Sequence, residues 1–151
     1  MIINQMSNRE CLDLLATKRL GRLACAEGSQ PYVVPIYYVY SDNFLYSLTT
    51  IGKKIEWMRA NPLVCLEVDD VAADSQEWSS VIVTGSFEEM PDTPQWRAKR
   101  EFAVGLLQQY ATFWEPALAT TVLHGKERPR IPVLFRIRIA GITGRRAIGE
   151  S

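Results

Sequence analysis

The fold is decided by residues 31–69, which read PYVVPIYYVYSDNFLYSLTTIGKKIEWMRANPLVCLEVD. Residues 32–40 are apolar at both alternating positions, as in a strand that is covered on both faces. Asp42 and Asn43 follow with turn chemistry, because both tolerate a left-handed backbone and hydrogen-bond to their own main chain. Residues 44–49 read as a returning strand, so the sequence predicts a β-hairpin here.

The segment after the hairpin predicts a short helix with a cationic start. Ile51, Ile55 and Met58 recur at helical spacing and define an apolar stripe for the core. Lys53 and Lys54 fall in the first turn, where the helix dipole disfavours positive charge. Free backbone N–H groups and ammonium groups together make a suitable seat for a phosphate. The alternative interpretation is an ordinary solvated helix start.

The rest of the chain predicts further helices and strands. A Ser-x-x-Glu capping box begins a helix over residues 8–17, and a proline at the first helical position begins another over residues 94–110. Strands are expected at residues 20–26, 63–68, 78–87 and 133–139. Short turns between successive strands favour an antiparallel barrel over parallel βαβ units. The expected fold class is therefore mainly β with flanking helices.

Burial patterns within these segments give finer expectations. The second long helix should bury an apolar stripe made of Phe102, Leu106 and Tyr110. On the closing strand, Arg136 and Arg138 are expected in solvent, opposite a buried face made of Val133, Phe135, Ile137 and Ile139. Gly85 is expected to mark a bulge or bend in its strand.

Composition limits the functions that the chain can have. Its 151 residues fit a single domain, 1–151, with a core of its own. The 17 Lys and Arg balance the 17 Asp and Glu, so the overall charge favours neither nucleic acid nor an anionic membrane surface. A signal peptide or membrane span is not expected, and the default location is cytoplasmic. The 3 cysteines lack C-x-x-C spacing, so we interpret them as buried hydrophobes and expect no metal site.

No set of residues stands out as a catalytic apparatus. No Ser/His/Asp triad can be assembled, and Asp69 and Asp70 are adjacent on a strand and so point to opposite faces. His124 is the single histidine of the sequence. It lies in a stretch expected to be irregular, 111–130, and a surface position is expected for it. The catalytic residues are therefore unassigned.

Several segments, in this order and spacing, resemble the pyridoxamine 5′-phosphate oxidase-like flavoproteins, and most closely the branch around the nitroimidazole-resistance proteins. They are GRLA at 21–24, PYVVPIYY at 31–38, the run from LY to NP at 45–62, and WSSVIVTG at 78–85. The resemblance covers most of the chain. It implies the FMN-binding split barrel, a six-stranded antiparallel barrel of Greek-key topology. It also implies a homodimer with FMN in a groove between the subunits.

The resemblance also assigns cofactor-binding residues. In that family the FMN phosphate lies on an Arg/Lys–Lys pair after the hairpin, and this pair corresponds to Lys53 and Lys54 here. The positions that line the flavin correspond to Val34, Pro35, Ile36, Ser47, Leu48, Thr49 and Ser80. Two alternatives to FMN come from related families. The deazaflavin F420 occupies this groove in some, and in others a histidine, for which His124 is the candidate here, ligates haem.

Departures from the family pattern shape the functional hypotheses. The nitroimidazole-resistance branch has a histidine where this chain has Leu48, which argues against nitroreductase chemistry. The oxidase proper has an arginine where this chain has Tyr32 and a C-terminal substrate motif that is not found here, so pyridoxamine phosphate oxidation is not expected. The first hypothesis is an FMN-dependent oxidoreductase that passes electrons from NAD(P)H to a small acceptor. The alternatives are a carrier of flavin or haem without turnover and a cofactor-free dimer that uses the groove to bind a partner.

Overall fold

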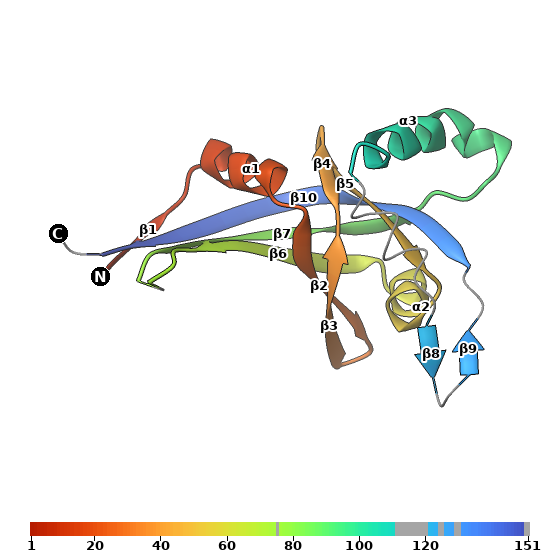
Figure 1. Ribbon diagram of the computed structural model, residues 1–151, viewed down its shortest axis with the longest axis horizontal. Coiled ribbons are helices and arrows are strands. Elements are labelled where there is room, and N and C mark those ends of the chain that lie inside the picture. The colour runs from red at the N-terminus through yellow and green to blue at the C-terminus, as the bar shows by residue number, and fades with distance from the viewer. Residues whose placement is uncertain (75, 111–120, 124–125, 129–130, 150–151) are drawn as a thin grey trace.

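The computed structural model describes residues 1–74, 76–110, 121–123, 126–128 and 131–149. Its main element is an antiparallel sheet of order β3-β2-β6-β7-β10-β5-β4, with β1 added to β10 (Figure 1). The strands are β1 Ile2–Gln5, β2 Leu20–Glu27, β3 Gln30–Tyr37, β4 Val39–Ser41, β5 Phe44–Thr50, β6 Leu63–Val71, β7 Trp78–Glu89 and β10 Pro132–Ile148. A separate pair consists of β8 Thr121–Leu123 and β9 Lys126–Arg128.

The sheet closes into a barrel through a break in one predicted strand. β3 and β4 stand at the two ends of the sheet order, yet only Tyr38 separates them along the chain. The backbone N–H of Tyr38 donates to the carbonyl oxygen of Arg19 at 2.8 Å, so it leaves the strand ladder. The single strand predicted over residues 32–40 is therefore wrong at this point. With β3 and β4 counted as one bent strand, the closed path in the described residues has the six strands that the resemblance implies.

The hairpin that follows is confirmed. β4 pairs with β5, and both turn residues have positive φ, 40° at Asp42 and 70° at Asn43. Two consecutive left-handed residues give a hairpin turn whose twist matches the flanking strands. At the other end of the hairpin, the Ser47 hydroxyl donates to the carbonyl oxygen of Tyr37 at 2.7 Å. This bond ties β5 to the end of β3 and so supports the closure of the barrel.

Helices flank the barrel, and none of those described is long and apolar enough to cross a membrane. They are α1 Asn8–Thr17, α2 Lys53–Ala60 and α3 Arg97–Leu107, the last preceded by the 3-10 turn η1 Pro94–Trp96. The predicted capping box of α1 is present, with Ser7 Oγ accepting from Glu10 N and Glu10 Oε1 accepting from Ser7 N. α2 packs against β2 and β7 and buries Ile55 and Met58 in the core, whereas Ile51 of the predicted stripe is exposed and precedes the helix.

The buried face of α3 agrees only in part with the predicted one. Leu106 and Tyr110 pack against the hydrophobic cluster under the helix, although Tyr110 lies beyond its last residue. Phe102 is exposed, and the residues that are fully buried are Ala103 and Leu107. The small side chain of Ala103 lets the helix backbone approach the sheet, so the bulky ring of Phe102 is left at the edge of the contact. There it meets the ring of Tyr46 edge-on, with 5.7 Å between the centroids.

Arg136 is buried, contrary to the prediction of a wet arginine face on β10. Its Nε donates to Glu88 Oε1 at 3.0 Å, and its guanidinium lies 3.9 Å from the ring centroid of Phe44. This part of β10 lies between the barrel core and a second hydrophobic cluster under α3, so both of its faces are covered. The buried residues of that second cluster are Val39, Tyr46, Met90, Ala103, Leu107 and Leu134. Arg138, two residues on, is exposed as predicted and reaches the other carboxylate oxygen of Glu88.

β10 is much longer than the predicted segment 133–139. With β6 and β7 it forms a long arm that carries β1, which was not predicted, and both chain termini lie at its far end (Figure 1). A bulge or bend was predicted at Gly85 of β7. The irregularity lies instead on the facing strand β10, whose register with β7 shifts between Ile139 and Gly141. Gly85 is needed because a Cβ atom there would overlap the carbonyl oxygen of Arg138.

Candidate cofactor site

The start of α2 presents uncompensated positive charge. Gly52 is its N-cap residue, and no described side chain caps the first-turn N–H groups. Neither Lys53 nor Lys54 forms an ion pair with a described carboxylate. Such pairs are formed by Lys18, Arg22, Arg59, Arg136, Arg138 and Arg146. Two ammonium groups and a free helix start therefore lie together, as the sequence predicts.

Lys54 is half-buried, and its ammonium group is close to the thiol of Cys25 on β2. Desolvation lowers the pKa of Lys54, because burial penalises the charged form, and the nearby thiol acts in the opposite direction. A half-buried cation without an anionic partner has lost part of its hydration, and no ion pair offsets that cost in free energy. A bound phosphate would offset that penalty, so the residues at this position fit a phosphorylated cofactor.

Lys53 has different surroundings, although it belongs to the same helical turn. It is exposed, and its Nζ lies 4.8 Å from the ring centroid of Tyr32 and 4.6 Å from that of Trp57. The two rings are in contact, with 5.5 Å between centroids and 58° between planes. The cation is therefore held over the faces of an aromatic pair.

The predicted flavin-lining residues of β3 alternate between the core and the surface. Val34 and Ile36 pack in the core, whereas Pro35 is exposed on the outer face of the barrel. Val33 is 64% exposed, so the prediction of a strand covered on both faces does not hold in the single chain. Within the described residues β3 pairs only with β2. Pro35 and the unpaired backbone edge of β3 are thus the parts of Val34–Ile36 that can contact a ligand from outside.

The predicted residues of β5 lie where that strand leads into α2. Ser47 is buried, and its hydroxyl hydrogen is used in the bond to Tyr37. Leu48 packs against the cluster under α3, and Thr49 is half-buried opposite Val133. β5 also lies close to β3. The structure thus brings the β3 and β5 positions to one region of the barrel, with the lysines at the helix that follows β5.

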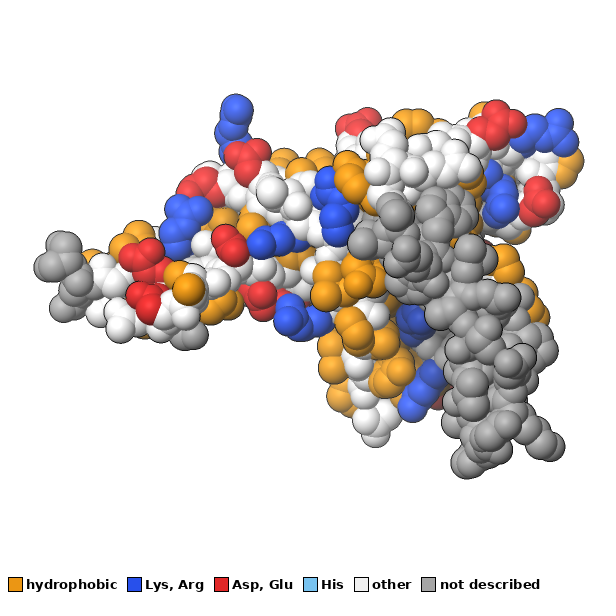
Figure 2. Space-filling view, viewed as in Figure 1, with side chains coloured by type: hydrophobic (Ala, Val, Ile, Leu, Met, Phe, Trp, Pro, Cys, Tyr) orange, Lys and Arg blue, Asp and Glu red, His pale blue; other side chains and the backbone are white. Residues whose placement is uncertain are grey.

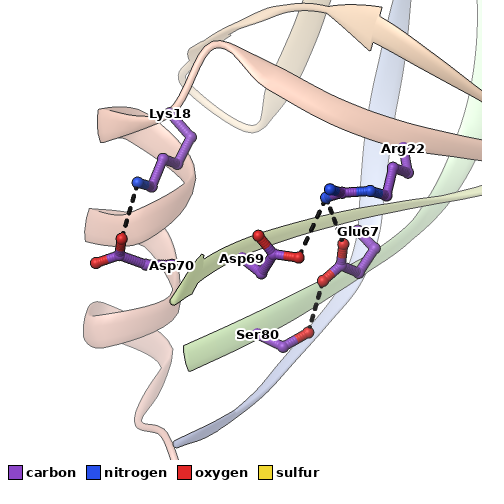
Figure 3. Close-up of polar contacts among 6 residues, drawn as sticks. All are labelled: Lys18, Arg22, Glu67, Asp69, Asp70 and Ser80. Carbon is purple, nitrogen blue, oxygen red and sulfur yellow. Dashed lines mark hydrogen bonds and ion pairs between the residues drawn. The ribbon is translucent and has the colours of Figure 1, made fainter. Parts of the chain in front are cut away.

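Ser80 lies on the outer face of the sheet, in a polar network with Glu67, Arg22 and Asp69 (Figure 3). Its Oγ donates to Glu67 Oε2 at 2.8 Å. Arg22 Nη1 lies 3.3 Å from Glu67 Oε1 and 3.1 Å from Asp69 Oδ2. Because Arg22 is the register partner of Pro35 on one side and Glu67 on the other, the network connects Ser80 with the outer face of β3. Asp70 has a different partner from Asp69, an ion pair with Lys18 at 3.1 Å.

An apolar surface surrounds this network. The strand register places on the same outer face the exposed side chains of Leu20, Val33, Leu63, Val71 and Ile82. A groove of about 530 Å³ runs along it and is lined mainly by small residues, among them Ala24, Cys65, Thr84 and Gly85. Figure 2 shows hydrophobic side chains gathered over β2 and β3. We call this surface the outer sheet face. An exposed apolar area of this kind marks an interaction surface.

The contact of Tyr32 with Lys53 and Trp57 was not predicted. Trp57 lies four residues after Lys53, a spacing that places both side chains on the same side of a helix, so this half of the contact was present in the sequence. Tyr32 comes from another strand, and only the fold brings it there. His124, the candidate haem ligand, lies outside the described residues.

Comparison with known proteins gives consistent results. Residues 7–146 match the family model described as pyridoxamine 5′-phosphate oxidase. An uncharacterized protein from Rhizobium meliloti (strain 1021) is 38% identical over 147 residues, which is 97% of each chain. The crystal structure of an FAD-binding protein from Mesorhizobium loti is 41% identical, covers 99% of each chain and has a TM-score of 0.78. A candidate 5-nitroimidazole antibiotic resistance protein from Bacteroides thetaiotaomicron, with 16% identity, a TM-score of 0.67 and coverage of 97% of this chain and 89% of that chain, is similar in fold alone.

The family match and the barrel agree along the chain. The matched residues, 7–146, run from the cap of α1 to near the end of β10 and so include the strands of the closed path. The two relatives of about 40% identity cover nearly all of it. The chain therefore belongs to the pyridoxamine 5′-phosphate oxidase-like family of split-barrel proteins.

Proposed function

We propose that the protein binds a flavin nucleotide through the FMN moiety that FMN and FAD share, with the phosphate at the start of α2. The observation that carries the proposal is the half-buried Lys54, which has no described carboxylate partner and whose pKa is lowered by burial. Lys53 adds a second positive charge in the same turn. The 41% identical protein from Mesorhizobium loti is described as FAD-binding, which supports a flavin rather than the alternatives F420 and haem.

The flavin ring would lie against the β3 and β5 positions described above. Pro35 and the free backbone edge of β3 offer contacts from the outer face, and Thr49 leads from β5 towards the lysines. Leu48 and Ser47 support β5 from within the fold. Ser80, whose hydroxyl is hydrogen-bonded to Glu67, would contact the flavin from the outer sheet face.

We propose further that two copies of the chain pair through the outer sheet face. Residues 32–40 are apolar at both alternating positions, which is typical of a strand covered on both sides, yet Val33 is 64% exposed in one chain. A second copy would supply the missing cover and would place its own outer face beside the flavin site. Such a homodimer agrees with the groove between subunits that the family resemblance implies.

The pairing can be tested by the mass of the protein in solution. Val33→Asp puts a charge at the centre of the proposed interface and should convert the dimer to a monomer in analytical ultracentrifugation. Ile2→Asp is the matched control, because Ile2 on β1 is 56% exposed and its strand register places it on the other face of the sheet from Val33. A wild-type monomer at micromolar concentration, or equal dimerisation by both variants, would contradict the proposed interface.

We propose that the protein is a cytoplasmic oxidoreductase, in which the bound flavin passes electrons from NAD(P)H to a small acceptor. A flavin supplies hydride and single-electron transfer, while the protein contributes binding, orientation and exclusion of water. The chain's own part is the phosphate seat on α2 and the apolar wall of β3 and β5. The alternative is a carrier that holds the flavin without turnover.

Steady-state oxidation of NADH and NADPH by flavin-loaded protein separates these two functions. An oxidoreductase should consume many equivalents of NAD(P)H per bound flavin when a quinone or another small acceptor is present. A carrier should stop at one equivalent or fewer. Failure to bind FMN, FAD or riboflavin at all would remove the basis of both.

A further inference from the structure

The aromatic pair at the start of α2 is not explained by the phosphate seat alone. Tyr32 lies on β3 opposite Cys25, and Trp57 lies on α2 one turn after Lys53. Both rings pack against the edge of the core, and both are half-buried. Each ring is thus fixed in place by the fold while part of it remains accessible.

The accessible faces are covered by a side chain that can move. Lys53 is exposed, and its Nζ lies over both ring faces, 4.8 Å from the centroid of Tyr32 and 4.6 Å from that of Trp57. It has no described carboxylate partner to hold it there. A lysine has a flexible side chain, and exposed cation–π contacts are weak. Lys53 can therefore leave the two rings for a stronger partner at little cost in free energy.

We propose that Tyr32 and Trp57 form a stacking surface for the adenine base of FAD, so that the site prefers FAD to FMN. This inference rests on the proposed function, because it requires the flavin phosphate to lie at Lys53 and Lys54. Lys53 then pairs with the pyrophosphate and leaves the rings to the base. Tyrosine and tryptophan faces bind planar bases by stacking. Because the two rings are tilted by 58°, a base stacked on one ring would meet the other ring with its edge.

The position of the pair favours the distal half of a dinucleotide. Lys53 touches both rings and belongs to the same turn as Lys54, so the stacking surface is adjacent to the phosphate seat. Tyr32 shares β3 with Pro35, but it pairs with the buried Cys25 and so lies on the other face of the strand. The aromatic pair is therefore a surface separate from the one that Pro35 offers to the flavin ring.

Binding titrations of the full chain with FMN, FAD and riboflavin test the inference, with quenching of flavin fluorescence or calorimetry as the readout. The wild type should bind FAD about tenfold or more tighter than FMN. Trp57→Ala should remove that preference and leave FMN affinity within about twofold of the wild type. Trp57→Phe, which keeps an aromatic face, should retain most of the preference.

A second readout does not depend on flavin. ADP carries the adenine and the pyrophosphate without the flavin. It should quench the tryptophan fluorescence of the wild type, in which Trp57 reports on the site, and should not quench that of Trp57→Phe. Equal affinities for FMN and FAD, with no effect of Trp57→Ala and no quenching by ADP, would overturn the adenine site and leave flavin binding intact. Loss of all flavin binding in the wild type would instead refute the proposed function and this inference with it.

Discussion

Replacement of both Lys53 and Lys54 by alanine should lower the affinity of the protein for FMN by at least about a hundredfold. Each charged hydrogen bond to a phosphate contributes about 1.5–3 kcal/mol, and the two together correspond to roughly two to four powers of ten. Titration with FMN, followed by quenching of flavin fluorescence, measures the loss. Lys99→Ala on α3 is the control, since that lysine lies over Trp96 and away from α2.

The lowered pKa of Lys54 adds a pH dependence with a definite sign. Phosphate affinity requires the protonated ammonium, so it should weaken as the pH rises through the pKa of Lys54, which lies below that of an exposed lysine. Lys54→Arg keeps its charge to much higher pH and should bind FMN with a flatter alkaline profile. Identical profiles of the wild type and Lys54→Arg, or unchanged FMN affinity in the double alanine variant, would contradict the assignment of the phosphate seat.

Gly85→Ala should destabilise the fold by about 1–3 kcal/mol, the range of substitutions that force a backbone shift in a packed interior. The new Cβ would overlap the carbonyl oxygen of Arg138 and lie 2.9 Å from Cγ2 of Ile137. Both obstacles belong to β10 at the bulge, where the strand cannot retreat without breaking its pairing with β7. Urea unfolding followed by circular dichroism measures the change.

Gly105→Ala is the matched control for this substitution. Gly105 lies inside α3, and a Cβ there meets no atom within 4 Å. Alanine should therefore stabilise the protein by about 0.5–1 kcal/mol through helix propensity. Equal effects of the two substitutions would show that the close approach of β7 and β10 is not a feature of the molecule in solution.

The parts of the fold that depend on local chemistry could be predicted from the sequence. The capping box of α1 and the left-handed turn at Asp42 and Asn43 are encoded in a few adjacent residues, and both are present. The break at Tyr38 and the burial of Arg136 depend on partners far along the chain, Arg19 in the first case and Glu88 and Phe44 in the second. Periodicity cannot reveal such partners, and it assigned Arg136 to solvent.

The candidate site divides in the same way. Lys53 and Lys54 are a local signal, because their place in the first turn follows from the helix pattern alone. The burial of Lys54 beside Cys25 and the seat of Lys53 on Tyr32 arise only when α2 packs against the barrel. The apolar outer face of β3 is a further case, since its sequence pattern is that of a covered strand and the single chain leaves it open.

Binding of FMN and riboflavin to the wild-type protein, compared in one titration series, tests the central claim most directly. The two ligands share the ring and the ribityl chain and differ in the phosphate, which is the group that Lys53 and Lys54 are proposed to hold. We predict that FMN binds at least about a hundredfold tighter than riboflavin. Equal affinity for the two ligands, or no binding of either, would contradict the claim that the start of α2 is a phosphate seat.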